Sequence, residues 1–146
     1  MAITSAICNS FKQEILEAEH NFTATTGNTF NLALYTSSAT LSASTTAYAS
    51  TNEITNTSGT SYSAKGKALT SVTPTLDSST AVCDFADVSW TSASFTANGC
   101  LIFNDSHATD ASVCAIDFGG DKTETSGTFT IQFPAAAAST AIIRIA

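Results

Sequence analysis

The strongest limit on the fold of this chain is an alternation of residue types over short runs. In Thr128–Phe133, two phenylalanines and an isoleucine alternate with two threonines and a glutamine. Phe30–Tyr35 and Val113–Phe118 also place apolar side chains at every second position. Because successive side chains of a β-strand point to opposite faces, this period predicts strands with one buried face.

Eight or nine short strands follow from this pattern, with turn residues between them. Asp77–Ser79 and Asn98–Gly99 are typical turn sequences, and Gly119–Gly120 with Ser126–Gly127 bound a predicted loop. Pro74 indicates an edge strand or a bulge. The predicted strands are Phe30–Tyr35, Asn52–Thr57, Leu69–Leu76, Ala81–Phe85, Val88–Trp90 and Ser94–Thr96 (short strands or a bent corner), Cys100–Phe103, Val113–Phe118, Thr128–Phe133 and Ala141–Ile145.

Regular strand spacing without intervening helices predicts an all-β fold and weighs against a parallel α/β sheet. We expect an antiparallel, jelly-roll-like β-sandwich. The 146 residues contain no internal repeat or linker, so a single domain over residues 1–146 is expected. The predicted core consists of Phe30, Leu32, Leu34, Leu69, Val82, Phe85, Trp90, Phe95, Leu101, Phe103, Ile116, Phe118, Phe129, Ile131, Phe133, Ile142 and Ile143.

One stretch, Ser5–Glu19, has helical periodicity instead. Its apolar residues recur at spacings of four or five, which predicts an amphipathic helix over about 5–19. A helix of this length is marginal alone and must pack on the sheets. The predicted apolar face is Ile7, Phe11, Ile15 and Leu16, the exposed face is Lys12, Gln13, Glu14 and Glu17, and the N-cap is Thr4 or Ser5.

Small hydroxyl groups dominate the polar residues: serine and threonine occupy 45 of 146 positions, while charged residues make up 12%. The net charge is −7, and the cations Lys12, Lys65, Lys67, Lys122 and Arg144 are scattered. Nucleic acids and anionic membranes attract clustered cations, so we expect neither as a partner. We find no apolar run of membrane-spanning length, and the residues after Met1 lack the pattern of a secretory signal.

The four cysteines, Cys8, Cys83, Cys100 and Cys114, form no CxxC pair, and neither histidine lies at a zinc-finger spacing from them. Three of them lie in apolar, strand-like runs. We therefore expect reduced, buried thiols, with a disulfide as the alternative. No metal or other cofactor is predicted.

The residues that could carry chemistry form no catalytic pattern. His20 follows the predicted helix and His107 lies in a polar loop, and both are expected to be solvated. A serine near either histidine means little in a chain so rich in hydroxyls, and a G-x-S-x-G sequence is absent. Asp105 and Asp110 could offer oxygen ligands to calcium, but without EF-hand spacing we expect solvated side chains. We predict no catalytic residue and no enzyme.

Two further carboxylates are unusual because they lie within apolar strands. If Asp84 and Asp117 are buried, each needs hydrogen-bond donors or a cation, for which Lys122 and Arg144 are candidates.

Three tyrosines, Tyr35, Tyr48 and Tyr62, lie near predicted strand ends. Edge packing is the expected role, and a binding patch is the alternative. One form of that alternative is a sugar site that combines Tyr48 with Asn52 and Glu53, because sugar sites pair aromatic platforms with carboxylate or amide groups.

Five segments together resemble a family of small, β-rich virion structural proteins of tailed bacteriophages. The likeness covers most of the chain in the same order, although Cys100 stands where a small residue such as alanine is expected. The segments are AICNSFKQEIL (6–16), FNLALYTSSATL (30–41), GTSYSAKGKALT (59–70), DFADVSWTSASFTANGCLIFND (84–105) and IDFGGDKTETSGTFTIQFP (116–134).

The resemblance implies a virion component that is made in the host cytoplasm and assembled in many copies. An acidic chain fits the outside of a capsid better than the side facing the genome, so we expect a capsid decoration (cement) protein. Its expected partners are copies of itself, with a trimer among the candidate states, and the major capsid protein. The expected contacts are the loop Thr36–Ser50 and the N-terminal helix. The alternatives are a tail, neck or fibre adaptor that binds tail proteins, and a glycan-binding module for host attachment.

Overall fold

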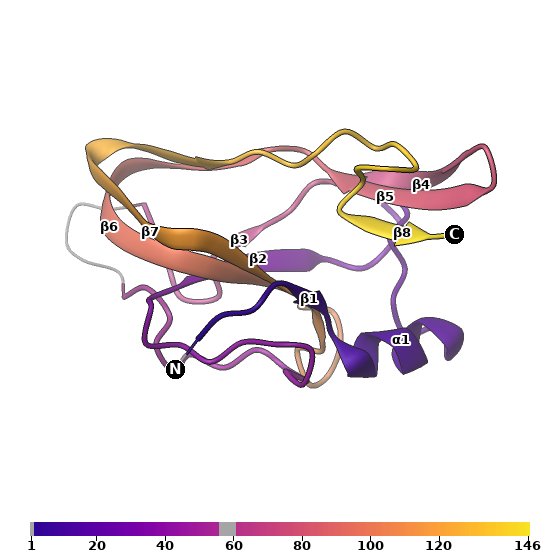
Figure 1. Cartoon of the computed structure of the whole chain (residues 1–146), viewed down its shortest axis with the longest axis horizontal. Coiled ribbons are helices and arrows are strands. Elements are labelled where there is room, and N and C mark those ends of the chain that lie inside the picture. The colour runs from indigo at the N-terminus through magenta and orange to yellow at the C-terminus, as the bar shows by residue number, and fades with distance from the viewer. Residues whose placement is uncertain (1, 56–60) are drawn as a thin grey trace.

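The computed structural model describes residues 2–55 and 61–146 as two antiparallel sheets and one short helix (Figure 1). This confirms the predicted all-β, sandwich-like class. The larger sheet has the strand order β1-β7-β6-β2-β3, and the smaller has the order β4-β5-β8. The elements are β1 (Ala6–Ile7), α1 (Asn9–Leu16), β2 (Phe30–Tyr35), β3 (Lys67–Ala68), β4 (Ser71–Asp77), β5 (Thr80–Phe85), β6 (Val88–Asn104), β7 (Ser112–Ile131) and β8 (Ile143–Ile145).

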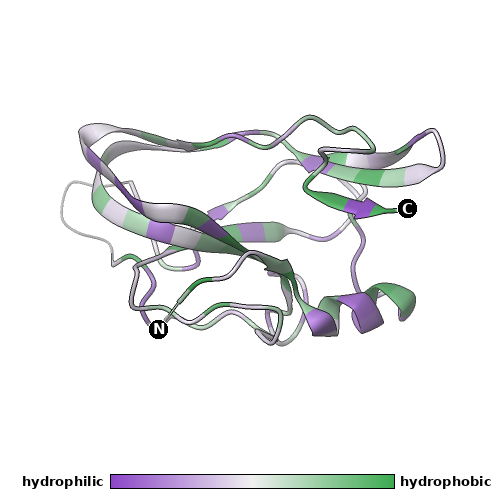
Figure 2. Cartoon of the chain, viewed as in Figure 1, coloured by the Kyte–Doolittle hydropathy of each residue, from purple (hydrophilic) through white to green (hydrophobic). Residues whose placement is uncertain are grey.

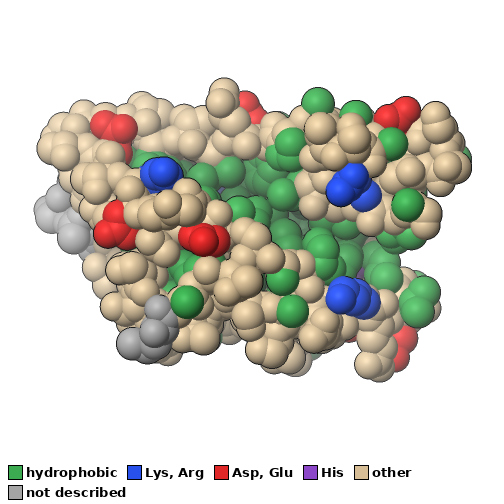
Figure 3. Space-filling model, viewed as in Figure 1, with side chains coloured by type: hydrophobic (Ala, Val, Ile, Leu, Met, Phe, Trp, Pro, Cys, Tyr) green, Lys and Arg blue, Asp and Glu red, His purple; other side chains and the backbone are tan. Residues whose placement is uncertain are grey.

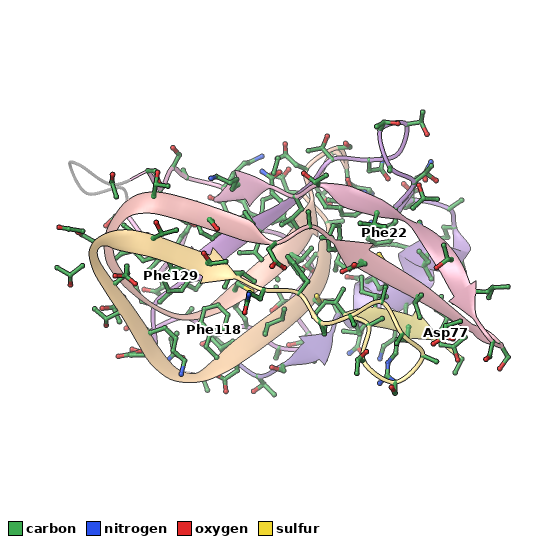
Figure 4. The ribbon with its side chains drawn as sticks, turned by 90° about the horizontal axis from the view of Figure 1, so that it is seen from above. Phe22, Asp77, Phe118 and Phe129 are labelled. Carbon is green, nitrogen blue, oxygen red and sulfur yellow. The ribbon has the colours of Figure 1, made fainter. Side chains whose placement is uncertain are left out.

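The molecule has a lower and an upper layer in the view of Figure 1. β6 and β7 form one long hairpin of the larger sheet that runs through both layers. Phe118 and Phe129 are eleven residues apart in β7, which would separate them by ~35 Å in a straight strand. Their ring centroids are only 6.4 Å apart, so the hairpin folds back on itself. Figure 4 shows both side chains on the curved β7. In Figure 1 the start of β7 lies in the lower layer near β2, and its end runs in the upper layer toward β4, β5 and β8.

The fold-back coincides with irregular strand pairing. Three register shifts lie between Trp90 and Gly99 of β6, and Gly119 and Gly120 of β7 adopt positive φ. Such bulges bend a strand and increase its twist. The predicted turn at Asn98–Gly99 and the predicted loop between 119 and 127 are therefore wrong, since these residues bend a continuous ladder instead of ending it.

The separate strands predicted on either side of these turns are joined in the same way. Val88–Trp90, Ser94–Thr96 and Cys100–Phe103 are parts of β6, and the bent-corner alternative is confirmed. Val113–Phe118 and most of Thr128–Phe133 are parts of β7.

The smaller sheet confirms the predicted central strand, turn and edge strand of residues 69–85. β5 is central, residues 78–79 form the turn into it, and Pro74 lies in the edge strand β4 at a register shift between Val72 and Thr75. Of the strand predicted at Asn52–Thr57, residues 56 and 57 lie outside the described residues. Its described part contains a single bridge, between Glu53 and Tyr35.

The helix is shorter than predicted. Ala6–Ile7 pair with β7 as β1, and the backbone N–H of Cys8 donates to Val113 O (3.0 Å), so strand pairing takes the first residues away from the helix. Cys8 is the N-cap in place of Thr4 or Ser5, and Ala18 at φ 62° follows the C-cap. Phe11 is buried, but Leu16 of the predicted apolar face is 88% exposed.

Both faces of the larger sheet are covered. Figure 2 shows apolar and polar bands along the strands, and a large cluster that includes Leu32, Phe85 and Trp90 fills the space between the layers. A second cluster lies on the other face, where Ala39 and Leu41 of the segment 36–50 pack on Tyr35 and neighbouring residues. The predicted surface loop is thus partly a cover for the sheet.

Most of the predicted core is buried. The exceptions are half-buried, and all but Phe95 surround one opening between the layers. They are Phe95, Ile116, Phe118, Ile131, Phe133 and Ile142.

Two glycines with similar φ make a matched test of this packing. Gly66 has φ 67°, and a Cβ there would overlap the Leu32 carbonyl, whereas a Cβ on Gly119 (φ 72°) meets open space among the described residues. Gly119→Ala should cost about 1–2 kcal/mol from backbone strain alone, and Gly66→Ala should cost more because β2 must also move. Urea unfolding followed by the fluorescence of Trp90 measures both. Equal losses of stability would contradict the close packing at Gly66.

Candidate interaction surface

An apolar slot opens between the two layers along the free edge of β7. β1 pairs only with Cys114 and Ala115 of β7, so the outer edge of Phe118–Ile131 has no strand neighbour among the described residues. A hollow of about 680 Å³ lies there, lined by Ile116 and Phe118 from one arm of β7 and by Phe129 and neighbouring residues from the other. Figure 3 shows the apolar side chains in this hollowed face.

A second hollow, of about 540 Å³, lies between α1 and the smaller sheet. Phe11 and Phe22 line one side, and Cys83, Ile143 and Ile145 line the other. Both hollows lie between the layers, and the adjacent residues Ile142 and Ile143 line one each. We call the two hollows together the slot.

Apolar side chains extend from the slot to the end of the smaller sheet. Leu76, Ala81 and Ile145 are direct cross-strand neighbours on β4, β5 and β8, so they share one face. Leu76 is 72% exposed and Ile145 is 58% exposed. An exposed apolar row that continues an open slot is typical of an interaction surface.

His20 positions one wall of the slot and is not solvated, contrary to the prediction. Its buried ring packs on Phe11 at a centroid distance of 4.9 Å. Asn104 Nδ2 donates to His20 Nδ1 (3.1 Å), so the ring proton lies on Nε2 and is donated to Glu14 Oε2 (2.8 Å). The ring thereby ties α1 to β6. His107 stacks on His20 at 6.2 Å and lies 3.4 Å from Glu19.

The three tyrosines surround a buried carboxylate that the sequence did not reveal as buried. Tyr62 OH donates to Glu53 Oε1 (2.7 Å) and Tyr48 OH donates to Oε2 (2.6 Å). Tyr35 OH donates to the Ala49 carbonyl (2.8 Å). Burial, and then Glu53, raise the pKa of Tyr62 and Tyr35 far above the usual value for a phenol. The cluster is packing, and it leaves no free carboxylate for a sugar site at Tyr48, Asn52 and Glu53.

The remaining carboxylates are already engaged. Lys65 Nζ lies 2.9 Å from Asp105 Oδ1 and 2.8 Å from Asp110 Oδ2, and these hydrogen bonds raise the pKa of the Lys65 ammonium. These two carboxylates, expected to be solvated with a calcium site as the alternative, are instead half-buried and paired with Lys65. Across the described residues we find no group of three or more histidine, cysteine or acidic side chains arranged to hold a metal.

The two carboxylates predicted within apolar strands need no cation. Asp117 is exposed and accepts the Gly119 N–H (2.9 Å), and half-buried Asp84 accepts the Phe85 N–H (2.8 Å). Neither of them pairs with Lys122 or Arg144 in the described structure. Arg144 donates instead to the Ala138 carbonyl (2.8 Å).

The four cysteines are free and buried, as predicted. Burial raises the pKa of every one of these thiols, that of Cys83 to about 12. Because the thiolate is the reactive form, the cysteines are inert in the folded chain.

Comparison with known proteins adds no relative: no family model, curated protein or solved structure matches the chain. Among the described residues, no helix is long and apolar enough to span a membrane.

The buried thiols and phenols predict a loss of stability at alkaline pH. Free cysteine and tyrosine have pKa values of 9.0 and 10.0, whereas burial raises the pKa of Cys83 and of Tyr48 to about 12 in the folded chain. The unfolded chain therefore releases protons that the folded chain keeps. The free energy of unfolding should be unaffected by these groups below about pH 9 and should fall between about pH 9 and pH 12.

Urea midpoints measured across that range by Trp90 fluorescence check this expectation. Tyr48→Phe should reduce the fall above about pH 10, because one of the phenols that ionise only on unfolding is removed. A midpoint independent of pH throughout the range would contradict the burial of these groups.

Proposed function

We propose that this protein is a structural component of a larger assembly, most specifically a capsid decoration protein of a tailed bacteriophage. The observation that carries the assembly role is the open slot along β7 with its exposed apolar row. A monomer that kept this surface in water would leave Leu76, Ile145 and the half-buried Phe118 without partners. Covering such a surface with a neighbouring subunit contributes about 25 cal/mol per Å² of apolar area to the complex, before the entropy cost of association is subtracted.

The polar surface supports the same role. Hydroxyl groups pair across the strands of the bent hairpin, as in Ser89 with Thr130 (2.8 Å) and Thr96 with Thr123 (2.7 Å). Neutral hydroxyls lose less hydration free energy than charged groups when a subunit covers them. The surface is therefore suited to contacts with many neighbours.

The viral part of the proposal rests on the five segments that resemble virion structural proteins, and on charge. A net charge of −7 is repelled by packaged nucleic acid, which favours the outer side of a capsid. Bound there, the chain would strengthen the capsid by burying surface across neighbouring capsid subunits.

The test compares capsids assembled with and without this protein. Capsids that carry the protein should release their genome at a higher temperature, as measured with a DNA-binding dye during heating. Equal release temperatures would contradict the cement role.

The position of the protein in the particle is a second, independent readout. Electron microscopy of the virion should place copies across the capsid lattice. A single ring of copies at the tail would contradict decoration and favour the tail-adaptor alternative.

A further inference from the structure

We propose that copies of this chain associate head to tail, with the β4–β5 hairpin of one copy inserted into the slot of the next. The proposal names the copy-to-copy contact that an assembly protein requires, and in that respect it rests on the proposed function. It follows from three properties of the two surfaces: their positions, their unpaired strand edges and their charges.

The hairpin and the β7 end of the slot lie at opposite ends of one molecule, whereas the second hollow is lined in part by Thr73, Pro74 and Ala81 of the hairpin itself. Figure 4 shows Asp77, at the end of β4, far from Phe118 and Phe129, which lie in the curve of β7. A copy therefore cannot fill the β7 end of its own slot with its own hairpin. A contact between two different patches is heterologous, and repetition of such a contact generates a ring or a filament.

The hairpin offers an exposed apolar edge. All of β4 between its two end residues is exposed, including Val72 at 44% and Leu76 at 72%. β4 pairs with β5 on one side and with no other strand of the described residues on its other side. Pro74 lacks an N–H and donates no bond to an added strand, so Thr75–Asp77, beside the hairpin turn, is the stretch that we propose for pairing.

The slot offers the complementary edge. The outer backbone edge of β7 is unpaired beyond Asp117 within the described structure, and Phe118 and Ile131 remain half-buried beside it. An added strand would pair with this edge while its apolar side chains enter the hollow, which is the geometry of β-strand addition. Leu76 is the exposed side chain of β4 that best fits an apolar hollow.

One cation at the slot favours the acidic β4–β5 hairpin as the bound segment. Ser71–Phe85 contains Asp77 and Asp84 and no cation, whereas the β7 end of the slot is lined by Lys122 and Glu124. Lys122 forms no ion pair with the described residues. Lys122 is the group here that attracts an acidic hairpin, and it lies between Asp121 and Glu124 in a stretch of β7 that also carries Asp117.

Disulfide trapping tests the contact directly. Leu76→Cys and Gln132→Cys place thiols on the hairpin and on the exposed slot lining, and the four native thiols are buried. A mixture of the two variants under mild oxidation should form several-fold more disulfide-linked dimer than either variant forms alone. Ser63→Cys, which is exposed and lies outside both hollows, replaces Gln132→Cys as the control and should form only background levels with Leu76→Cys.

Sedimentation of the full chain at high concentration provides a second readout. The average mass should rise beyond that of two copies, and Leu76→Asp should abolish the rise. Thr75→Asp adds the same charge to the same exposed strand one residue away, on the opposite face of the sheet, and should leave most of the rise intact.

Three outcomes would overturn the proposal. They are a monomer at all concentrations without a mixed disulfide above the control, a closed dimer in which Leu76→Cys pairs with itself, and equal effects of the Leu76 and Thr75 variants. The first outcome would assign the slot to a different protein partner. None of these measurements involves a capsid, so their failure leaves the decoration role to be judged by capsid stability alone.

Discussion

The fold depends on the back-folding of the β6–β7 ladder. This single hairpin provides strands for both layers, and the contact between Phe118 and Phe129 closes it across the interior. Buried aromatic pairs, such as Trp90 with Tyr62 at 5.7 Å, hold the layers together beside the bend. Because one continuous strand forms both walls of the β7 hollow, its outer edge has no strand neighbour over most of its length within the described structure, and this hollow is a direct consequence of the bend.

Buried polar groups then hold the irregular segments against this scaffold. Glu53 receives two phenol donors and thereby anchors the segments that carry Tyr48 and Tyr62. His20 and Asn104 do the same for α1, which forms one wall of the second hollow. Each of these groups would cost about 1–3 kcal/mol if it were buried without a partner. Their hydrogen bonds are satisfied within the chain, so they act as structural supports.

The hydroxyl-rich composition of the exposed faces agrees with an assembly role. Serine and threonine occupy the exposed positions of alternating strands, as Thr128 and Thr130 do beside Phe129. The surface is thus polar but carries few charges, and apart from Leu16 at the end of α1 the large apolar groups left exposed or half-buried are concentrated at the slot and on the smaller sheet. A proposed head-to-tail contact joins these two places and leaves the hydroxyl-rich faces free for other neighbours.

The sequence by itself determined the strands and most of the core, because the period of two in segments such as Phe30–Tyr35 records which face is buried. It also indicated the buried cysteines and the edge position of Pro74. Only the tertiary structure decided that residues 98–99 and 119–127 bend a ladder, because glycine and serine permit both a turn and a bulge. The burial of His20 and Glu53 likewise depends on partners distant in the sequence, and local patterns do not predict such pairings. The slot, too, exists only once β7 folds back. Whether the outer edge of β7 has a strand neighbour depends on the pairing of distant segments, which no local pattern shows.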